Sequence, residues 1–380
     1  MIGQYWRRRH LIGLKAPPSE GGPRPAARIT MKLKRRQKLA LYRYLMIGGF
    51  GLILLWVGLI RLSLSSDQVP RKSIRSAHVP LMFDLSAVPS FSERLNKTMD
   101  MSVSLITHAS VEKVHLLEDI VMRWEGPISC AVYAFEQHPE QLAHVLQNPA
   151  IRERVSVHLV VGIDPYLPYP INVMRNVALD YADTDYVFAI DIDFIPSQSC
   201  YREILHHLST KPPTKQVWIV PAFERIISQS EHVTPGALPG TKEKLFDDIS
   251  SHTIMPFHVA YFAPGHGPTN FEKWYESNSA YQIEWEPRFE PYIVAYRPGL
   301  PRYFDAFTGY GYNKLSWIME ISLAGYSFYV LPQSFLTHIN HPGRQERWPK
   351  KDMQSMYFEK FLPYLREKYP EKEVIDVDWV

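Results

Sequence analysis

The chain has 380 residues, 46% of them hydrophobic and 13% aromatic, so disorder is excluded for most of its length and a substantial core can form. The formal net charge of +3 is unevenly spread, because residues 1–43 hold 12 Lys and Arg and one acid, leaving 30 basic and 38 acidic residues beyond. The basic balance therefore does not indicate a nucleic-acid partner, and we expect none.

The first predicted element is a membrane anchor. The 17 residues from Tyr44 to Ile60 carry no charge and, as a helix rising about 1.5 Å per residue, would span about 25 Å. We predict a basic cytoplasmic tail over 1–43 and a transmembrane signal-anchor helix over 44–62. Basic residues before the anchor favour a single-pass type II orientation, with the rest of the chain lumenal. The short span favours membranes of the early secretory pathway.

A stretch rich in Ser, Pro and basic residues follows, and we predict a stem over 63–99. Asn96 begins the only N-glycosylation sequon, which would be usable in a lumenal protein. The two cysteines are Cys130 and Cys200. A disulfide in an oxidising lumen and free thiols in the core both remain open.

The body, which we place at 100–380, alternates between strand and helix patterns. A helix over 171–182 carries an apolar face at helical spacing, and a charged helix is expected near 350–368. The predicted strands are 128–135, 155–161, 186–195 and 217–223. This order predicts an α/β fold with a mainly parallel central sheet and helices on both faces.

Two acids stand at the end of the third strand, in the sequence "DYVFAIDIDFIP". As strand residues, Asp191 and Asp193 would share one face, and Pro196 would end the ladder after them. The carboxyl end of a strand is where open α/β sheets bind ligands, so we interpret the pair as a site. An exposed turn with two solvated acids is the alternative.

Carboxylates at this spacing suit a divalent cation that neutralises a diphosphate leaving group. In an ideal strand these two acids are too far apart to bind one metal directly. Both reach it only if the chain turns there or if a water bridges one carboxylate to the metal. "FLTHINH" offers His338 and His341 as a third ligand, and an imidazole beside oxygen ligands favours Mn²⁺ over Mg²⁺. Haloacid-type phosphatases also open with Asp-x-Asp, but they place Thr or Val where this chain has Ile195, and no partner set for that chemistry is evident.

Five blocks resemble, in this order, glycosyltransferase family 49: "NVMRNVALDYADTDYVFAIDIDFIP", "VPAFE", "GHGPTNFEKWY", "FEPYIVAYR" and "FTGYGYNKLSWIMEISLAGYSFYVLPQSFLTHINHP". The resemblance covers roughly residues 100–370, and ordered blocks are far more specific than a lone Asp-x-Asp. It implies a GT-A fold, a UDP-sugar donor, manganese and inversion at the anomeric carbon.

The resemblance also implies roles for individual residues. The metal ligands would be Asp191, Asp193 and His338. Donor-binding residues would be Arg175, Asn176, Asp191 and Glu224. Sugar or acceptor residues would be Thr269, Asn270, Trp274, Tyr310 and Asn313, although core packing is the commoner role of a Trp. The catalytic base would be Glu320, or else Asp305; a buried structural role for Glu320 stays open.

We therefore expect an inverting, metal-dependent glycosyltransferase of the Golgi membrane that moves one sugar from a UDP-sugar to a glycoprotein glycan. Glucuronic acid is the first choice for the transferred sugar. Arg225, Lys273 and Lys314 are the candidate cations for the carboxylate of glucuronic acid. Another donor such as UDP-N-acetylglucosamine and a catalytically silent glycan-binding protein are the alternatives. A homodimer is left open.

Overall fold

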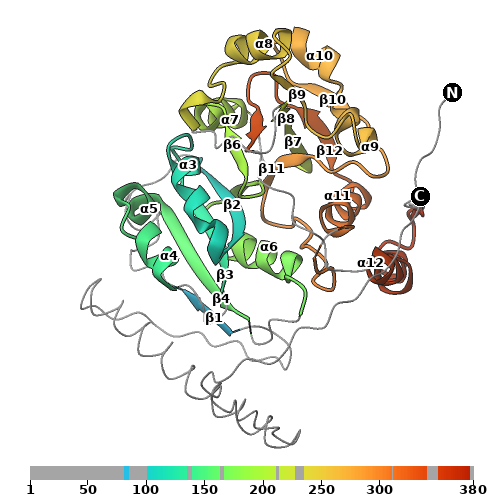
Figure 1. Ribbon diagram of the computed structural model, residues 1–380. Helices are drawn as coiled ribbons and strands as arrows, with labels where there is room; N and C mark the ends of the chain where they lie inside the picture. Colours follow the sequence, from blue (N-terminus) through green and yellow to red (C-terminus); the bar gives the residue numbers. More distant parts are fainter. Residues whose placement is uncertain are drawn as a thin grey trace, which may run out of the picture. The chain divides into compact units, whose positions relative to one another are not determined.

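The computed structural model describes residues 81–84, 101–134, 139–162, 167–210, 214–226, 235–309, 311–339 and 350–376 (Figure 1). The predicted tail, the predicted anchor, Asn96, Tyr310 and His341 lie outside the described residues. Among the residues that are described, no helix is both long and apolar enough to cross a bilayer.

The described strands form a nine-stranded and a four-stranded sheet. They are β1 (Leu81–Asp84), β2 (Val103–Ser110), β3 (Ile128–Ala134), β4 (Val155–Val161), β5 (Tyr186–Ala189), β6 (Phe194–Pro196), β7 (Gln216–Val220), β8 (Ala222–Arg225), β9 (Ile254–Pro256), β10 (Tyr281–Ile283), β11 (Tyr292–Tyr296), β12 (Ser327–Val330) and β13 (Leu336–His338).

The described helices are η1 (Val111–Leu116), α3 (Leu117–Val121), α4 (Pro139–Val145), α5 (Pro149–Arg154), α6 (Ile171–Asp180), α7 (Cys200–Ser209), η2 (Pro235–Ala237), α8 (Lys242–Ser250), α9 (Ala263–His266), η3 (Gly267–Thr269), α10 (Phe271–Glu276), α11 (Asn313–Leu323), α12 (Lys350–Met356), η4 (Tyr357–Phe361) and α13 (Leu362–Lys368). The expected helices near 171–182 and 350–368 are both present.

The large sheet has the strand order β1-β4-β3-β2-β5-β11-β7-β12-β10. Its first half is parallel through β4, β3, β2 and β5, as predicted, and β12 also runs parallel to β7. The pairs β1–β4, β5–β11, β11–β7 and β10–β12 are antiparallel. The sheet is therefore mixed, which corrects the prediction of a mainly parallel sheet. In addition, β1 falls inside the stretch predicted as stem.

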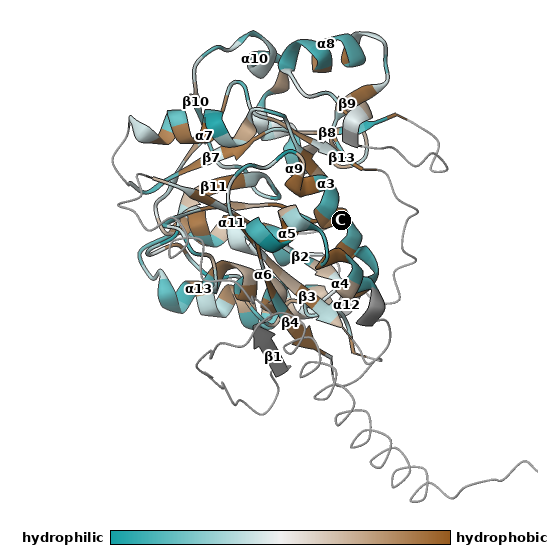
Figure 2. Cartoon of the chain, turned by 90° about the vertical axis from the view of Figure 1, so that its left-hand side faces the viewer, coloured by the Kyte–Doolittle hydropathy of each residue, from teal (hydrophilic) through white to brown (hydrophobic). Residues whose placement is uncertain are grey.

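Helices cover both faces of this sheet (Figure 1). Alternate residues of one strand belong to different apolar clusters: Leu105 belongs to the cluster that includes residues of α3, α5 and α7, whereas Ile106 belongs to the cluster that includes residues of α6 and α11. Figure 2 shows brown, hydrophobic strands inside and teal segments on the outer helices. Burial of both strand faces explains why the sequence has continuous apolar runs rather than strict alternation.

The chain turns where the sequence predicted one continuous strand over 186–195. Strand β5 ends at Ala189, and β6 begins at Phe194 in the smaller sheet, where Pro196 pairs with Leu336 of β13. The Asp pair therefore lies in the turn between two sheets. The expected strand over 217–223 is likewise divided at Pro221 into β7 and β8, and β8 also pairs with β13.

Candidate active site

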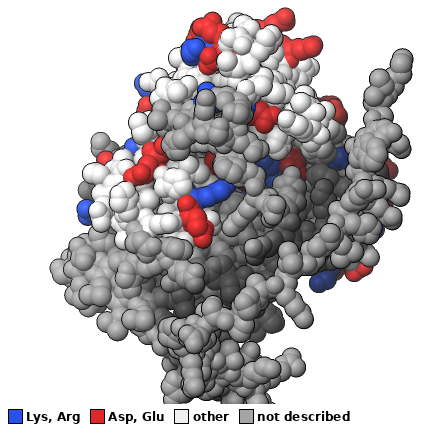
Figure 3. Space-filling model, in the orientation of Figure 1, with Lys and Arg blue, Asp and Glu red and all other residues white. Residues whose placement is uncertain are grey.

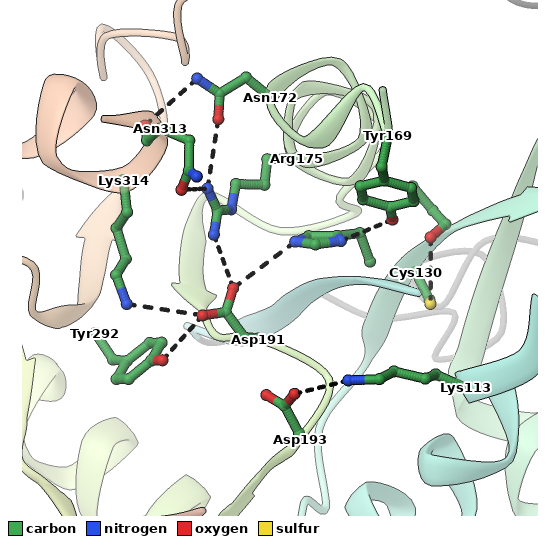
Figure 4. A network of polar contacts seen from close by, with 12 residues as sticks. Lys113, Cys130, Tyr169, Asn172, Arg175, Asp191, Asp193, Tyr292, Asn313 and Lys314 are labelled. Atoms are coloured by element: carbon green, nitrogen blue, oxygen red, sulfur yellow. Dashed lines mark hydrogen bonds and ion pairs between the residues drawn. The ribbon is translucent and has the colours of Figure 1, made fainter. Parts of the chain in front are cut away.

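Asp191 is the centre of a buried polar group at the carboxyl end of β5 (Figure 4). Its Oδ1 accepts a 2.8 Å hydrogen bond from Nη2 of Arg175 on α6, and its Oδ2 accepts a 2.9 Å bond from the Tyr292 hydroxyl at the start of β11. Lys314 Nζ lies 3.7 Å from Oδ2, and His108 Nε2 lies 3.7 Å from Oδ1. Side chains from four separate elements, α6, β11, α11 and β2, thus converge on one carboxylate.

The backbone order explains this convergence. β2 and β5 are parallel neighbours, with Ile106 opposite Ala189. His108 and Asp191 each lie two residues further along, so both are at the same edge of the sheet, where these strands have their carboxyl ends. The antiparallel β11 begins at that edge with Tyr292. Lys314 stands in the first turn of α11, which starts after Tyr312 at a φ of +57°.

Electrostatics keep Asp191 ionised. Burial raises the pKa of this carboxyl, but Arg175, Lys314 and His108 together outweigh burial and hold the pKa well below its ordinary value. Burial lowers the pKa of Lys314, and the charge of Asp191 opposes that effect. Arg175 and Lys314 supply two cationic groups beside the carboxylate of Asp191, and these cations are the groups suited to bind a further anion.

The cationic character of the site comes from these buried groups. On the face drawn in Figure 3, acidic and basic side chains of the described residues are interspersed. A small hollow beside Asp191 is lined by Thr107, Arg175, Tyr292, Tyr303 and Lys314, among others. Its volume of about 10 Å³ is room for a single water, so a larger ligand would have to lie over it.

Asp193 engages a different cation. Its Oδ2 lies 3.2 Å from Nζ of Lys113 in η1, on the other side of the turn from Arg175 (Figure 4). His338 is brought close by the backbone: it stands opposite Phe194 in the β6–β13 pair, and Ile339 N donates to Asp193 O at 2.8 Å. The three expected metal ligands therefore come from one turn and the strand beside it.

The side chains of these residues are not gathered into a ligand set. Within the described ranges, no group of three or more His, Cys, Asp or Glu side chains is placed to hold a metal ion. The ring of His338 packs against Phe194 and Phe257, with ring centroids 4.9 and 5.1 Å apart. Two carboxylates and an imidazole match manganese in donor chemistry, but a metal on Asp193 would have to displace Lys113.

The expected donor residues Asn176 and Glu224 support neighbouring backbone. Asn176 donates from Nδ2 to Tyr303 O at 2.7 Å and to Asp305 Oδ1 at 2.6 Å, and its Oδ1 accepts from Tyr303 N. This fixes the loop that leads to α11. Glu224, opposite His338 in the β8–β13 pair, accepts from the backbone N of His258 at 2.9 Å. Asn313 joins the site directly, because its Oδ1 accepts a 2.7 Å bond from Arg175.

Glu320, the first choice for the base, belongs to a different cluster. It is 1% exposed, and its Oε1 accepts from Lys368 Nζ at 2.7 Å and from the Tyr364 hydroxyl at 2.8 Å. Both partners lie on α13. These contacts favour the structural role that the sequence left open. The second choice, Asp305, is exposed and has one oxygen bonded to Asn176.

Three expected sugar-binding residues have structural contacts instead. Trp274 is completely buried in the core, and its Nε1 donates to Leu331 O at 2.8 Å, so it presents no face to a sugar. Thr269 is buried, and its backbone O accepts from the Tyr281 hydroxyl. Asn270 caps α10 at a φ of +57° by accepting from Lys273 N at 3.1 Å. The burial of Trp274 argues against sugar stacking, whereas the sugar-binding roles expected for Thr269 and for the exposed Asn270 stay predictions.

The sequence analysis missed four residues near Asp191. His108 lies in β2 and Lys113 in η1 directly after it, and nothing in the sequence links them to the distant Asp pair. Glu290 precedes β11, and Tyr292 begins it. Burial raises the pKa of Glu290, while the charges of Lys314 and Arg175 oppose this increase. The Asp pair identified one side of the site, whereas these residues join it only through strand order.

A mixed α/β sheet with buried cations around an acidic turn at its strand ends is typical of enzymes that bind anionic ligands such as nucleotides. The family described as "Glycosyl-transferase for dystroglycan" matches residues 102–166 and 163–370. The chain belongs to this glycosyltransferase family.

Curated relatives agree with the assignment. The xylosyl- and glucuronyltransferase LARGE1 of Mus musculus is 36% identical over 245 residues, covering 63% of this chain and 31% of that protein. LARGE2 of Homo sapiens is 34% identical over 245 residues, covering 63% of this chain and 33% of its own length. The chain thus matches about a third of each relative.

Solved structures show looser likeness. S. aureus TarS 1-349 in complex with UDP-GlcNAc has a TM-score of 0.42 at 12% identity, over 72% of this chain and 68% of that one. GalNAc-T7 with UDP, GalNAc and Mn²⁺ has a TM-score of 0.43 at 12% identity, over 72% of this chain and 51% of the other.

Proposed function

We propose that this chain is a GT-A-type inverting glycosyltransferase that moves a single glucuronic acid from UDP-glucuronic acid to a glycan acceptor. The observation that carries the proposal is the pairing of Arg175 and Lys314 with the one carboxylate of Asp191. A diphosphate and a sugar carboxylate are both anions, and the cations Arg175 and Lys314 are suited to bind them.

The identity of the sugar rests on the family and on Lys314. The relatives are named as xylosyl- and glucuronyltransferases, which supports glucuronic acid as the donor sugar and xylose as the acceptor end. Among the contacts of the described residues, Lys314 is the candidate cation that approaches Asp191, at 3.7 Å. Lys273 lies over the ring of Tyr281, and Arg225 lies on β8, opposite Ile254. We assign Lys314 to the donor carboxylate or the adjacent phosphate.

Manganese would be held by Asp193, His338 and Asp191, and it would supply Lewis-acid neutralisation of the leaving diphosphate. The chain's own residues have complementary roles. Arg175 and Asn313 orient Asp191, and Asn176 fixes the loop before α11. We propose Glu290 as the base that takes the acceptor proton, with Asp305 as the alternative. Glu290 stands two residues before Tyr292, whose hydroxyl donates to Asp191, and it interacts electrostatically with Asp191 and Lys314.

The predicted anchor supports a Golgi location with a lumenal catalytic part, which we propose together with the activity. The test is release of UDP by the full chain in detergent, with methyl β-D-xyloside as acceptor and a panel of UDP-sugars, with and without Mn²⁺. We expect turnover with UDP-glucuronic acid that requires Mn²⁺ and is lost in Asp193→Ala. Preference for UDP-N-acetylglucosamine would overturn the assigned donor. Sugar binding without turnover under any condition would favour a silent glycan-binding protein.

A further inference from the structure

A continuous series of aromatic rings leads away from Asp191. It starts at Tyr292, whose hydroxyl donates to Asp191 at 2.9 Å. The ring of His266 stacks on Tyr292 with centroids 6.0 Å apart and an interplanar angle of 28°. Phe257 meets His266 edge to face at 5.2 Å. These contacts make one aromatic wall between the acidic turn and the segment that follows β9.

The aromatic wall ends at the protein surface. His258 stacks on Phe257 with centroids 3.8 Å apart and planes inclined by 16°, and Tyr261 meets His258 edge to face at 6.4 Å. Tyr261 is 85% exposed. Large aromatic side chains are usually at least partly covered, so a ring left this open at the end of a packed series needs an explanation.

Tyr261 is held in place by a tight turn. His258 has a φ of +55°, an unfavourable conformation for a residue with a side chain, and its backbone N is fixed by the carboxylate of Glu224 at 2.9 Å. The backbone N of Tyr261 donates to His258 O at 3.0 Å, and Phe262 N donates to the same oxygen at 2.7 Å. The exposed ring is therefore presented on a fixed support.

The aromatic wall lies within electrostatic reach of the reacting centre. Burial first, and then the positive charge of Lys314, lower the pKa of both His258 and His266. The donor's anionic groups match the buried cations at the inner end. The outer end, with Tyr261, carries no charge of its own and is open to water, so it is suited to a different part of the substrates.

We propose that Tyr261, supported by His258, is an acceptor subsite that binds the sugar ring next to the one that receives the transferred sugar. One face of a pyranose presents C–H groups that pack against an aromatic ring while its hydroxyls remain in water, as on a ring with this exposure. The inference rests on the proposed function for its position in the reaction. It concerns residues of the acceptor side, not the donor.

The kinetic test compares acceptors of one and two rings, methyl β-D-xyloside and methyl β-xylobioside, with the full chain at saturating UDP-glucuronic acid. In Tyr261→Ala we expect the KM for the two-ring acceptor to rise roughly 5- to 10-fold. The KM for the one-ring acceptor and for the donor should change less than about twofold. Tyr261→Phe and Tyr261→Trp should retain the wild-type preference, because they keep a stacking surface.

A matched control is Met122→Ala, which truncates another large side chain, 72% exposed at the end of α3. We expect no change in either KM for this variant. Equal KM values for Tyr261→Ala and wild type with the two-ring acceptor would overturn the subsite while leaving the proposed transfer intact.

A binding measurement separates the subsite from the activity. Saturation-transfer NMR of methyl β-xylobioside with the full chain and UDP should give signals on both rings in wild type. In Tyr261→Ala the signals of the ring remote from the acceptor hydroxyl should be lost. If the wild type transfers no glucuronic acid but shows this pattern, the donor assignment fails and the subsite stands. Absence of binding by the wild type, or an unchanged pattern in the variant, overturns the subsite.

Discussion

Arg175 donates from Nη2 to Oδ1 of Asp191 across 2.8 Å, with the Arg175 side chain 8% exposed and the Asp191 side chain 27% exposed. Removing Arg175 takes away the cation nearest to this largely buried carboxylate and leaves it with Lys314 and His108, each 3.7 Å away. We therefore expect Arg175→Met to lower the free energy of unfolding by about 3 kcal/mol, measured by urea denaturation. The control is Arg302→Met, which breaks the exposed pair with Asp180 and should cost less than about 1 kcal/mol. Equal losses would contradict a buried pair.

Lys314 should decide which donor is used. If it binds the carboxylate of glucuronic acid, Lys314→Met should lower kcat/KM for UDP-glucuronic acid about 10- to 100-fold more than for UDP-glucose, because a charge-assisted hydrogen bond is lost only with the acid. Lys273→Met, which removes a lysine from α10, serves as the control and should leave the ratio unchanged. A uniform loss with both donors would place Lys314 at the diphosphate instead.

Glu290 is predicted to be the base. Glu290→Gln should reduce kcat by about 10²- to 10⁴-fold, whereas Asp305→Asn should stay within a few-fold of wild type. Burial raises the pKa of Glu290 above its ordinary value of 4.5, and a base works only when deprotonated. The wild-type rate should therefore fall on the acid side, at a pH above that ordinary value. The opposite ranking of the two variants would assign the role to Asp305.

Glu320 should matter for stability and not for chemistry. Its carboxylate is buried and accepts from Lys368 and Tyr364, so Glu320→Ala leaves their donors without this acceptor and should cost about 1–3 kcal/mol of unfolding free energy. The kcat of the folded variant should remain within a few-fold of wild type. A loss of 100-fold or more without a change in stability would restore Glu320 as the base.

Cys200 makes stability depend on pH. Burial raises the pKa of its thiol to about 12, whereas a thiol in the unfolded chain ionises near pH 8.5. The unfolded state therefore loses this proton first, and the free energy of unfolding falls by about 1.4 kcal/mol per pH unit above roughly pH 8.5. In Cys200→Ala this contribution is absent, so the difference in the free energy of unfolding between wild type and Cys200→Ala should narrow between pH 9 and 10.5. Parallel curves of the free energy of unfolding against pH for the two proteins would contradict a buried free thiol at Cys200.

Strand and helix positions followed largely from local patterns. The apolar run over 155–161 and the helical spacing from Ile171 were sufficient, because each reports burial by neighbouring elements. The turn at the Asp pair could not be recognised from the sequence, because the apolar pattern reports burial and not the direction of the chain. Ile190 and Ile192 are both 4% exposed and enter the same core cluster, which reproduces the periodicity of a strand although the chain bends there.

Much of the site could not be read from local sequence. His108, Lys113 and Glu290 approach the Asp pair only because β2, β5 and β11 are neighbours in the sheet. The antiparallel insertion of β11 between β5 and β7 has no local signal in the sequence. Trp274 shows a further limit of local sequence. A buried Trp and a sugar-stacking Trp can have the same neighbouring residues, and they differ only in whether the fold covers the ring.

Helix α11 carries Lys314 in its first turn and Glu320 two turns later, where Lys368 and Tyr364 of α13 close over it. Helix α13 is therefore needed to complete the support of a helix that reaches the reacting centre. A premature stop codon after Lys350 would remove no residue that surrounds Asp191. It would nevertheless be expected to yield an inactive or rapidly degraded product, because α11 would lose the cover of its far end.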